Sequence, residues 1–336
     1  MTRDRILLAH GGGGSLTREL ITKFIAPKLD NPVLKPLEDS AVLVMSGKGY
    51  AFTTDSYVVK PYFFPGGDIG KLAVCGTVND LAMQGAHPYW LSLSFILEEG
   101  LPLADLQKII GSISETAREV GVEIVTGDTK VVERGKCEGL YINTSGIGRI
   151  CSPNWWGAKS IKVGDVVLVN GPLGEHGIAV MSQREGISFS SSVVSDCAPL
   201  WPLVKTILDQ GLEVHAMRDL TRGGLAAAVC DIAESAGLGI SLDEAALPIG
   251  REVRGACDLL GLDPLTIANE GKCIVFCPEE HSETILSAMK NHPLGKDARL
   301  IGRVMPGPKG MAMMRTTIGG ERIIDMPTGE DLPRIC

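Results

Sequence analysis

The chain has 336 residues, of which 44% are hydrophobic and 21% are charged, and this balance excludes an intrinsically disordered protein. The 32 basic and 40 acidic residues give a net charge of −8, which argues against nucleic acid as a partner, because phosphate binding requires a basic face. No apolar run is long enough to span a bilayer or to act as a signal peptide, so we expect a cytoplasmic protein with no membrane contact.

The first part of the chain alternates β-like and helical segments. Strands are predicted from β-branched and aromatic residues at 41–45, 51–59, 89–97, 122–132 and 139–150. Helices are predicted from apolar residues at helical spacing at 69–85 and 102–121, where Gly85 and Gly121 are the expected ends. The length of the whole chain is sufficient for two domains with separate cores.

The polar segment 151–160 breaks this alternation, and we place a domain boundary near residue 155. The second part repeats the pattern, with predicted strands at 164–171, 271–278 and 298–305 and helices at 174–186, 200–211, 223–239 and 281–293. Two α/β or α+β halves of similar pattern predict a ligand site between them. Trp155 and Trp156, beside the boundary, are expected to cover a seam between domains or subunits.

The nine cysteines are scattered through apolar segments, which is typical of reduced thiols in a reducing compartment. No CxxC motif occurs, and the nearest pair is Cys273 and Cys277 in the apolar segment "CIVFC". We interpret that pair as buried core thiols, because no histidine or second pair accompanies it.

Five aspartates lie beside turns or within apolar elements: Asp39, Asp55, Asp80, Asp128 and Asp219. Each one alone is more readily explained as a cap or turn residue. Together they are suitable ligands for Mg²⁺, which prefers hard oxygen atoms and is commonly bound with a nucleotide. The pattern leaves both interpretations open.

Two glycine-rich segments are candidates for phosphate binding. "HGGGGS", which contains Gly12 and Gly13, predicts either a flap whose N–H groups surround phosphate oxygens or a flexible tether. "FPGGDIGKLA" is not a P-loop, because Pro65 and Leu72 stand where that motif needs Gly and Ser/Thr. Lys71, at the start of the predicted helix, either meets a phosphate or is a solvated surface lysine.

Lys130 and Glu270 are candidates for acid–base chemistry. Lys130 follows "GDT" among apolar residues, where partial desolvation would make it a base or a phosphate ligand. Glu270, in "ANEGK", is either functional or a turn carboxylate, and the local sequence does not decide between these roles. His87 and His176 are interpreted as loop or capping residues rather than ligands.

The last residue, Cys336, ends a segment with prolines, a glycine and no apolar periodicity. It is not a prenylation signal, because that cysteine lies four residues from the end. The alternatives are an accidental exposed thiol and a thiol on a swinging arm. About a dozen residues at ~3 Å each would reach several tens of Å.

Motifs along the whole chain closely resemble the HypE family of hydrogenase maturation factors, within the ATP-binding PurM-like superfamily. They include "TTDSYVV", "FFPGGDIGKLAVCGTVNDLA", "VTGDTKVVERG", "MRDLTRGGL" and the terminal "PRIC". The resemblance implies an α+β fold with two PurM-like domains, residues 1–155 and 156–324, and a mobile tail, 325–336. The first domain would form a β-barrel with a second subunit in a homodimer.

The resemblance also implies roles for individual residues. Asp39, Asp80 and Asp219 match Mg²⁺-binding aspartates, and Lys130 and Glu270 match residues near a substrate carried on the Cys336 thiol. We therefore expect catalysis by Cys336 with Glu270 or Lys130 as the base. The expected ATP-binding residues are Asp55, Lys71, Asn79, Asp128, Gly12 and Gly13.

The activity implied by the resemblance is ATP-dependent dehydration of a carbamoyl group on Cys336 to a thiocyanate. The carbamoyltransferase HypF would load the thiol, and the HypC–HypD complex would receive the cyano group as a cyanide ligand of the [NiFe] hydrogenase iron. The alternatives are a non-catalytic scaffold or carrier and another PurM-like kinase or ligase. A selenophosphate synthetase is disfavoured, because residues 1–15 contain no cysteine.

Overall fold

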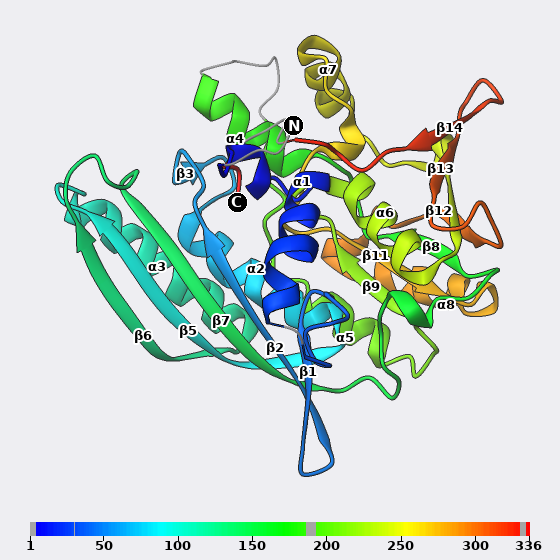
Figure 1. Cartoon of the computed structure of the whole chain (residues 1–336), viewed down its shortest axis with the longest axis horizontal. Coiled ribbons are helices and arrows are strands. Elements are labelled where there is room, and N and C mark those ends of the chain that lie inside the picture. The colour runs from blue at the N-terminus through cyan, green and yellow to red at the C-terminus, as the bar shows by residue number, and fades with distance from the viewer. Residues whose placement is uncertain (1–4, 30, 186–192, 330–333) are drawn as a thin grey trace.

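The computed structural model describes residues 5–29, 31–185, 193–329 and 334–336, which form two α+β halves, each built around one large sheet (Figure 1). The first half contains the strands β1 (Ala41–Met45), β2 (Lys48–Tyr57), β3 (Phe63–Phe64), β4 (Gly67–Asp68), β5 (Ala86–Glu98), β6 (Glu123–Val132) and β7 (Leu140–Ile150). Its helices are α1 (Ser15–Glu19), α2 (Ile69–Met83) and α3 (Leu103–Val120).

The second half begins after a connection without strands. Its strands are β8 (Val166–Val169), β9 (Ala216–Asp219), β10 (Gly239–Asp243), β11 (Cys273–Cys277), β12 (Arg299–Met305), β13 (Ala312–Arg315) and β14 (Glu321–Ile324). Its helices are α4 (Glu175–Glu185), α5 (Trp201–Leu208), α6 (Gly224–Ala236), α7 (Arg251–Leu260) and α8 (Glu279–Lys290). The sequence pattern did not predict α1, α7, β3, β4, β9, β10, β13 or β14, whereas the helices and strands that it did predict are present and the α+β class is confirmed.

The first sheet has the strand order β1-β2-β7-β5-β6, and α2 packs on one face of it. We call this the inner face and the opposite side the outer face. Alternation along β2 shows the two sides: Thr53 and Tyr57 are buried on the inner face, whereas Phe52 and Thr54 are exposed on the outer one. Asp68 begins α2 by accepting hydrogen bonds from the first-turn N–H groups of the helix.

The second sheet has the order β14-β13-β10-β12-β8-β11-β9 and contains the most buried strands of the chain. Every residue of β8 and β11 is buried, as the apolar sequence "CIVFC" led us to expect for Cys273 and Cys277. Among the described residues, no helix is long and apolar enough to cross a membrane.

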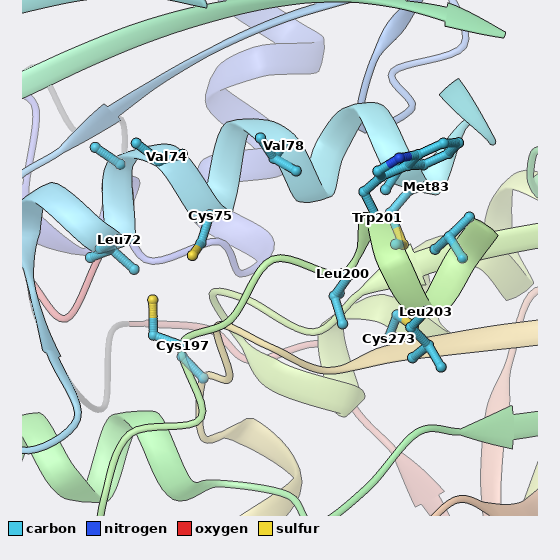
Figure 2. Close-up of a cluster of buried hydrophobic side chains, with 14 of the residues drawn as sticks. Leu72, Val74, Cys75, Val78, Met83, Cys197, Leu200, Trp201, Leu203 and Cys273 are labelled. Carbon is cyan, nitrogen blue, oxygen red and sulfur yellow. The ribbon is translucent and has the colours of Figure 1, made fainter. Parts of the chain in front are cut away.

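The two halves share a continuous core, and α2 lies at their junction. This helix contacts β2, β5 and β7 of the first sheet and also β9 and α5 of the second half. Figure 2 shows Leu72 and Val78 of α2 in one apolar cluster with Leu200 from the second half, and the thiols of Cys75 and Cys197 pointing toward one another across the junction. A side chain on α2 can therefore reach both halves.

Candidate functional site

Three aspartates from separate segments converge at this junction. Asp39 precedes β1, Asp80 lies on α2 and Asp219 ends β9, and one carboxylate oxygen of each lies within 4.8 Å of the others. The Oδ2 atoms of Asp39 and Asp219 are buried and have no hydrogen-bond partner among the described residues. Asp80 Oδ2 accepts a hydrogen bond of 2.7 Å from the Thr53 hydroxyl. Converging oxygen ligands with unused lone pairs fit a hard divalent cation such as Mg²⁺.

The electrostatics of these three carboxylates also fit a cation. Burial raises the pKa of Asp39 and of Asp80 well above the ordinary value, and the neighbouring aspartates raise both further. Burial likewise raises the pKa of Asp219 to about 6. Arg218 opposes this, with its Nε 2.8 Å from Asp39 Oδ1, but one guanidinium does not neutralise three acids. The three carboxyls therefore bind protons more tightly than exposed acids do, and a bound cation would take the place of those protons.

Glu270 lies in a buried turn beside the aspartates. The residue is 2% exposed, and its Oε1 has no hydrogen-bond partner among the residues that the structure describes. Burial raises the pKa of Glu270 well above the ordinary value, with smaller contributions from Cys197 and Asp219. The turn is held by Asp196, whose carboxylate accepts from the N–H groups of Glu270 and Gly271 at 3.2 and 3.1 Å.

Gly271 and Asn79 fix the position of this turn. A Cβ on Gly271 would lie 2.0 Å from the Asp196 carbonyl oxygen, so only glycine fits there. The Asn79 amide donates to the carbonyl oxygens of Ala198 and Glu270 at 3.2 and 3.3 Å, and its Oδ1 accepts from Leu200 N at 2.7 Å. Asn79, which we expected to contact ATP, is thus buried with both amide hydrogens engaged inside the protein.

One of the two predicted phosphate-binding segments packs on the second half, and the other lies at the start of α2 in the first half. Gly12 is buried, and Gly13 has a φ of +76° with its would-be Cβ 2.5 Å from Arg222 Cβ, so this segment packs on the turn before α6. Lys71 is in the first turn of α2, and its Nζ donates to the Gly66 carbonyl at 3.1 Å. The glycine-rich segment is therefore packed in this chain and is not a free tether.

Asp55 joins the cluster, whereas Asp128 does not. Asp55 lies on the inner face of β2, and its charge raises the pKa of Asp80 and Asp219. Asp128 pairs in register with Ser94 of β5, and both side chains are on the outer face of the sheet. Strand β6, which carries Asp128, is three strand spacings from β2. Asp128 is thus about 14 Å from β2, on the opposite face. The five aspartates do not form one site within this chain.

Lys130 is also on the outer face, two residues after Asp128. Its side chain is 68% exposed, and its Nζ lies 2.6 Å from Asp128 Oδ2. The expectation of a partly desolvated lysine is wrong for the isolated chain. The apolar neighbours that suggested it, Val131 and Val132, belong to the edge strand β6, which is exposed along nearly all its length.

The end of the tail is docked on the protein, with Ile335 buried and Cys336 partly exposed. Residues 334–336 run along residues 58–60, with Val58 N donating to Cys336 O at 3.2 Å and Lys60 N to Arg334 O at 3.1 Å. Ile335 is 5% exposed in the shared core, and Cys336 packs against it. Figure 1 shows the carboxy terminus beside α4 and β3. Part of the tail for which we predicted mobility, residues 330–333, lies outside the described residues.

Arg222 connects the tail with the acidic residues. The charge of Cys336 is the largest influence raising the pKa of this guanidinium; burial opposes the rise, and Asp55 and Glu270 add to it. The arginine therefore lies close enough to sense the carboxy-terminal residue and both carboxylates. Cys336, Glu270 and Asp55 are thus all within electrostatic range of one guanidinium group.

Sequence analysis misinterpreted His176. It is not a loop residue but the second residue of α4, with no exposed surface, and its Nε2 lies 2.6 Å from the Ile335 carbonyl oxygen. A polar residue directly before the apolar run "GIAVM" was the only local signal of its burial. His87 is partly exposed and stacks on Tyr89 at 4.7 Å between ring centroids.

Comparisons with known proteins match both halves. The N-terminal domain of AIR synthase related proteins matches residues 37–150, and the C-terminal domain matches residues 162–314. A protein of Escherichia coli (strain K12) named carbamoyl dehydratase HypE is 49% identical over 338 residues, covering 99% of this chain and all of the relative.

Solved structures agree with this similarity. A crystal structure of a HypE–HypF complex has a chain that is 45% identical with a TM-score of 0.87, covering 92% of this chain and 99% of that one. Hydrogenase maturation protein HypE in complex with ATP is 44% identical with a TM-score of 0.84, covering 99% of this chain and 100% of that one. The resemblance and the two-domain PurM-like architecture are confirmed: the chain belongs to the HypE family.

Proposed function

We propose that this protein is an ATP-dependent carbamoyl dehydratase that converts a thiocarbamate on Cys336 into a thiocyanate. The observation that carries the proposal is the docking of residues 334–336 along residues 58–60, with Ile335 buried and with Cys336 and Glu270 both within electrostatic range of Arg222. An accidental terminal thiol would have no reason to be held there by main-chain hydrogen bonds. The family relatives named carbamoyl dehydratase, and the HypE structure solved with ATP, support the same reaction.

The reaction balances as a transfer of the carbamoyl oxygen to phosphate. That oxygen attacks the γ-phosphorus of ATP, ADP leaves, and the nitrogen loses one proton. The C–O bond then breaks, phosphate leaves with the oxygen, and the nitrogen loses its second proton as the C≡N bond forms. The chain must therefore orient the thiocarbamate, stabilise the phosphoryl group and accept protons from nitrogen.

We propose that Asp39, Asp80 and Asp219 hold Mg²⁺. The ion, when bound, would offset the charge on the transferring phosphoryl group. Gly12, Gly13, Lys71 and Asp55 remain the proposed contributors to the ATP site, and Asp128, on the outer face, could contribute only from a second subunit of a homodimer. Asn79 would act by holding the Glu270 turn, because both of its amide hydrogens are already donated to the protein.

We propose Glu270 as the base that removes protons from nitrogen. Its Oε1 makes no hydrogen bond within the described chain and is available to accept one from a carbamoyl N–H. Its raised pKa makes the carboxylate a stronger base than an exposed glutamate. Lys130, on the outer face, could take part only from a second subunit of a homodimer. Loading by HypF fits the HypE–HypF crystal structure, and delivery to HypC–HypD is part of the same proposal.

The test is mass spectrometry of the carboxy-terminal peptide. The protein is incubated with HypF, carbamoyl phosphate and ATP, with and without Mg²⁺. We expect a carbamoyl adduct on Cys336 that loses one water only when ATP and Mg²⁺ are both present. An adduct that never loses water would leave only a carrier, and no adduct would remove Cys336 from the mechanism. Glu270→Gln should load the adduct but not dehydrate it.

A further inference from the structure

The tail is held mainly through its main chain. In an extended segment successive carbonyl groups point to opposite sides. The carbonyls of Arg334 and Cys336 accept from residues 58–60, so the Ile335 carbonyl points away from that edge. A buried carbonyl without a donor would disfavour this position of the tail. His176 supplies the donor, with Nε2 2.6 Å from the Ile335 oxygen.

A directional chain of hydrogen bonds orients His176. For Nε2 to donate to a carbonyl, the imidazole must carry its proton there, and Nδ1 must accept. Nδ1 lies 2.8 Å from the Ser195 hydroxyl, and that oxygen itself accepts from Cys197 N at 3.1 Å. The Ser195 proton is thereby directed at Nδ1. Desolvation lowers the pKa of His176, which keeps the ring neutral, as this arrangement requires.

A second residue of α4 holds the neighbouring carbonyl. Arg184 donates from Nη2 to the Arg334 oxygen at 2.6 Å and from Nε to the Lys60 oxygen at 2.7 Å. We call residues 58–60, His176 and Arg184 the tail seat. Fixing the Arg334 and Ile335 carbonyls fixes the peptide group that precedes Cys336, and therefore the position of the Cys336 Cα atom from which the thiol side chain extends.

The same short segment positions the tail and the proposed base. Ser195 orients His176, and the next residue, Asp196, binds the N–H groups of Glu270 and Gly271. Ser195 is itself anchored to the first half, because its N–H donates to the Pro65 carbonyl at 2.8 Å. The consecutive residues Ser195 and Asp196 thus position, respectively, the histidine that binds the tail and the turn that carries the proposed base Glu270.

We propose that His176, oriented by Ser195, is a positioning residue that binds the Ile335 carbonyl and so holds Cys336 docked at the tail seat for the reaction. The inference rests on the proposed function, because it explains how the carrier thiol is placed for dehydration. It makes one prediction that is independent of the reaction: loss of the His176 hydrogen bond should expose Cys336.

The test compares the alkylation rates of Cys336 and Cys151 in the full-length protein with N-ethylmaleimide, followed by peptide mapping. Cys151 is exposed and serves as the internal reference. We expect His176→Leu to raise the Cys336 to Cys151 ratio about tenfold, and Ser195→Ala to raise it less. His176→Gln, whose amide can still donate, should return the ratio toward wild type.

A matched control separates positioning from general destabilisation. His215 is also buried, with its nitrogens 2.7 and 2.8 Å from Asp165 and Glu213, but these contacts are remote from the tail. His215→Leu should lower stability and leave the ratio unchanged. An equal rise in that variant, or no rise in both His176→Leu and Ser195→Ala, would overturn the proposal.

Activity provides the second measurement. After loading by HypF, His176→Leu should carry the carbamoyl adduct as wild type does but lose water at least tenfold more slowly. Failure of wild type to dehydrate would count against the proposed function and leave the alkylation result to decide the role of His176. Dehydration by His176→Leu at the wild-type rate would refute the positioning role in catalysis.

Discussion

The two faces of the five-stranded sheet carry similar residues in different environments. On the inner face, Asp55 lies close to the buried aspartate cluster under α2. On the outer face, Asp128 is exposed and paired with Lys130. In this sheet the face on which an acid lies, and not its residue type, decides whether the carboxylate is solvated or lies near buried acids whose pKa values are raised.

The largest expected difference between the faces is in activity. Asp219→Asn removes one proposed Mg²⁺ ligand and should slow dehydration of loaded Cys336 by about 100- to 1,000-fold. The matched control is Asp209→Asn, which changes an exposed aspartate paired with Lys205. Its dehydration rate should equal that of wild type. The measurement is single-turnover loss of water from the tail peptide. A rate within a few-fold of wild type would remove Asp219 from the metal site.

The second prediction concerns pH and stability without metal. The pKa of Asp219 is about 6 in the folded chain and 3.8 ordinarily, so the folded state binds the proton more tightly. The free energy of unfolding is therefore highest at low pH. It falls as the pH rises through this interval, and Asp219 contributes about 3 kcal/mol to that fall.

Urea unfolding in chelator at several pH values measures this effect. Asp219→Asn should remove the contribution of Asp219 to the pH dependence of the unfolding free energy. The variant should therefore be more stable than wild type at pH 7 in chelator. Added Mg²⁺ should stabilise wild type and have a smaller effect on the variant. A variant that is less stable at pH 7, with unchanged pH dependence, would contradict the electrostatic argument.

The third prediction tests whether a second subunit covers the outer face. Phe52, Ile147 and Trp90 face one another in register across β2, β7 and β5, and each is more than a third exposed. Ile147→Glu would bury a charge in the proposed dimer interface and should weaken dimerisation at least tenfold in sedimentation equilibrium. Ile318→Glu, at a residue 94% exposed in the second half, should have no effect.

The smallest expected effect on stability comes from breaking the ion pair between Lys130 and Asp128 on the outer face. Lys130→Ala should change the free energy of unfolding of the monomer by less than about 1 kcal/mol, because exposed ion pairs contribute little. A larger loss in urea unfolding would show that the pair is structural. If Lys130 acts in a neighbouring subunit's site, mixed Lys130→Ala and Glu270→Gln dimers should recover dehydration that neither parent performs.

The sequence predicted the elements well but could not predict the face on which Asp128 lies. A bulge in β6 leaves Val125 without a partner, since Ile124 pairs with Leu91 and Thr126 with Ser92. Without that extra residue Asp128 and Lys130 would point inward. The bulge depends on pairing with β5, some 30 residues earlier, and local periodicity does not show it.

The residues of the site were predictable to different extents. Asp39 and Asp219 were suggested by turns beside strands, and Cys336 by its place at the end of the chain. The structural contacts of Asn79 and His176 were not predicted, because their partners lie more than a hundred residues away in sequence. Their roles depend on tertiary packing, which makes a buried amide or imidazole a structural clamp.

The tail seat has a consequence for the order of events. The contacts described for it hold main-chain atoms and the Ile335 side chain, and none of these changes when the sulfur is modified. The tail seat itself should therefore bind the tail in the same way whether Cys336 carries a thiol, a thiocarbamate or a thiocyanate. Any preference among these three forms must come from groups that face the sulfur, such as the proposed base Glu270, and from the proteins that load and unload the tail.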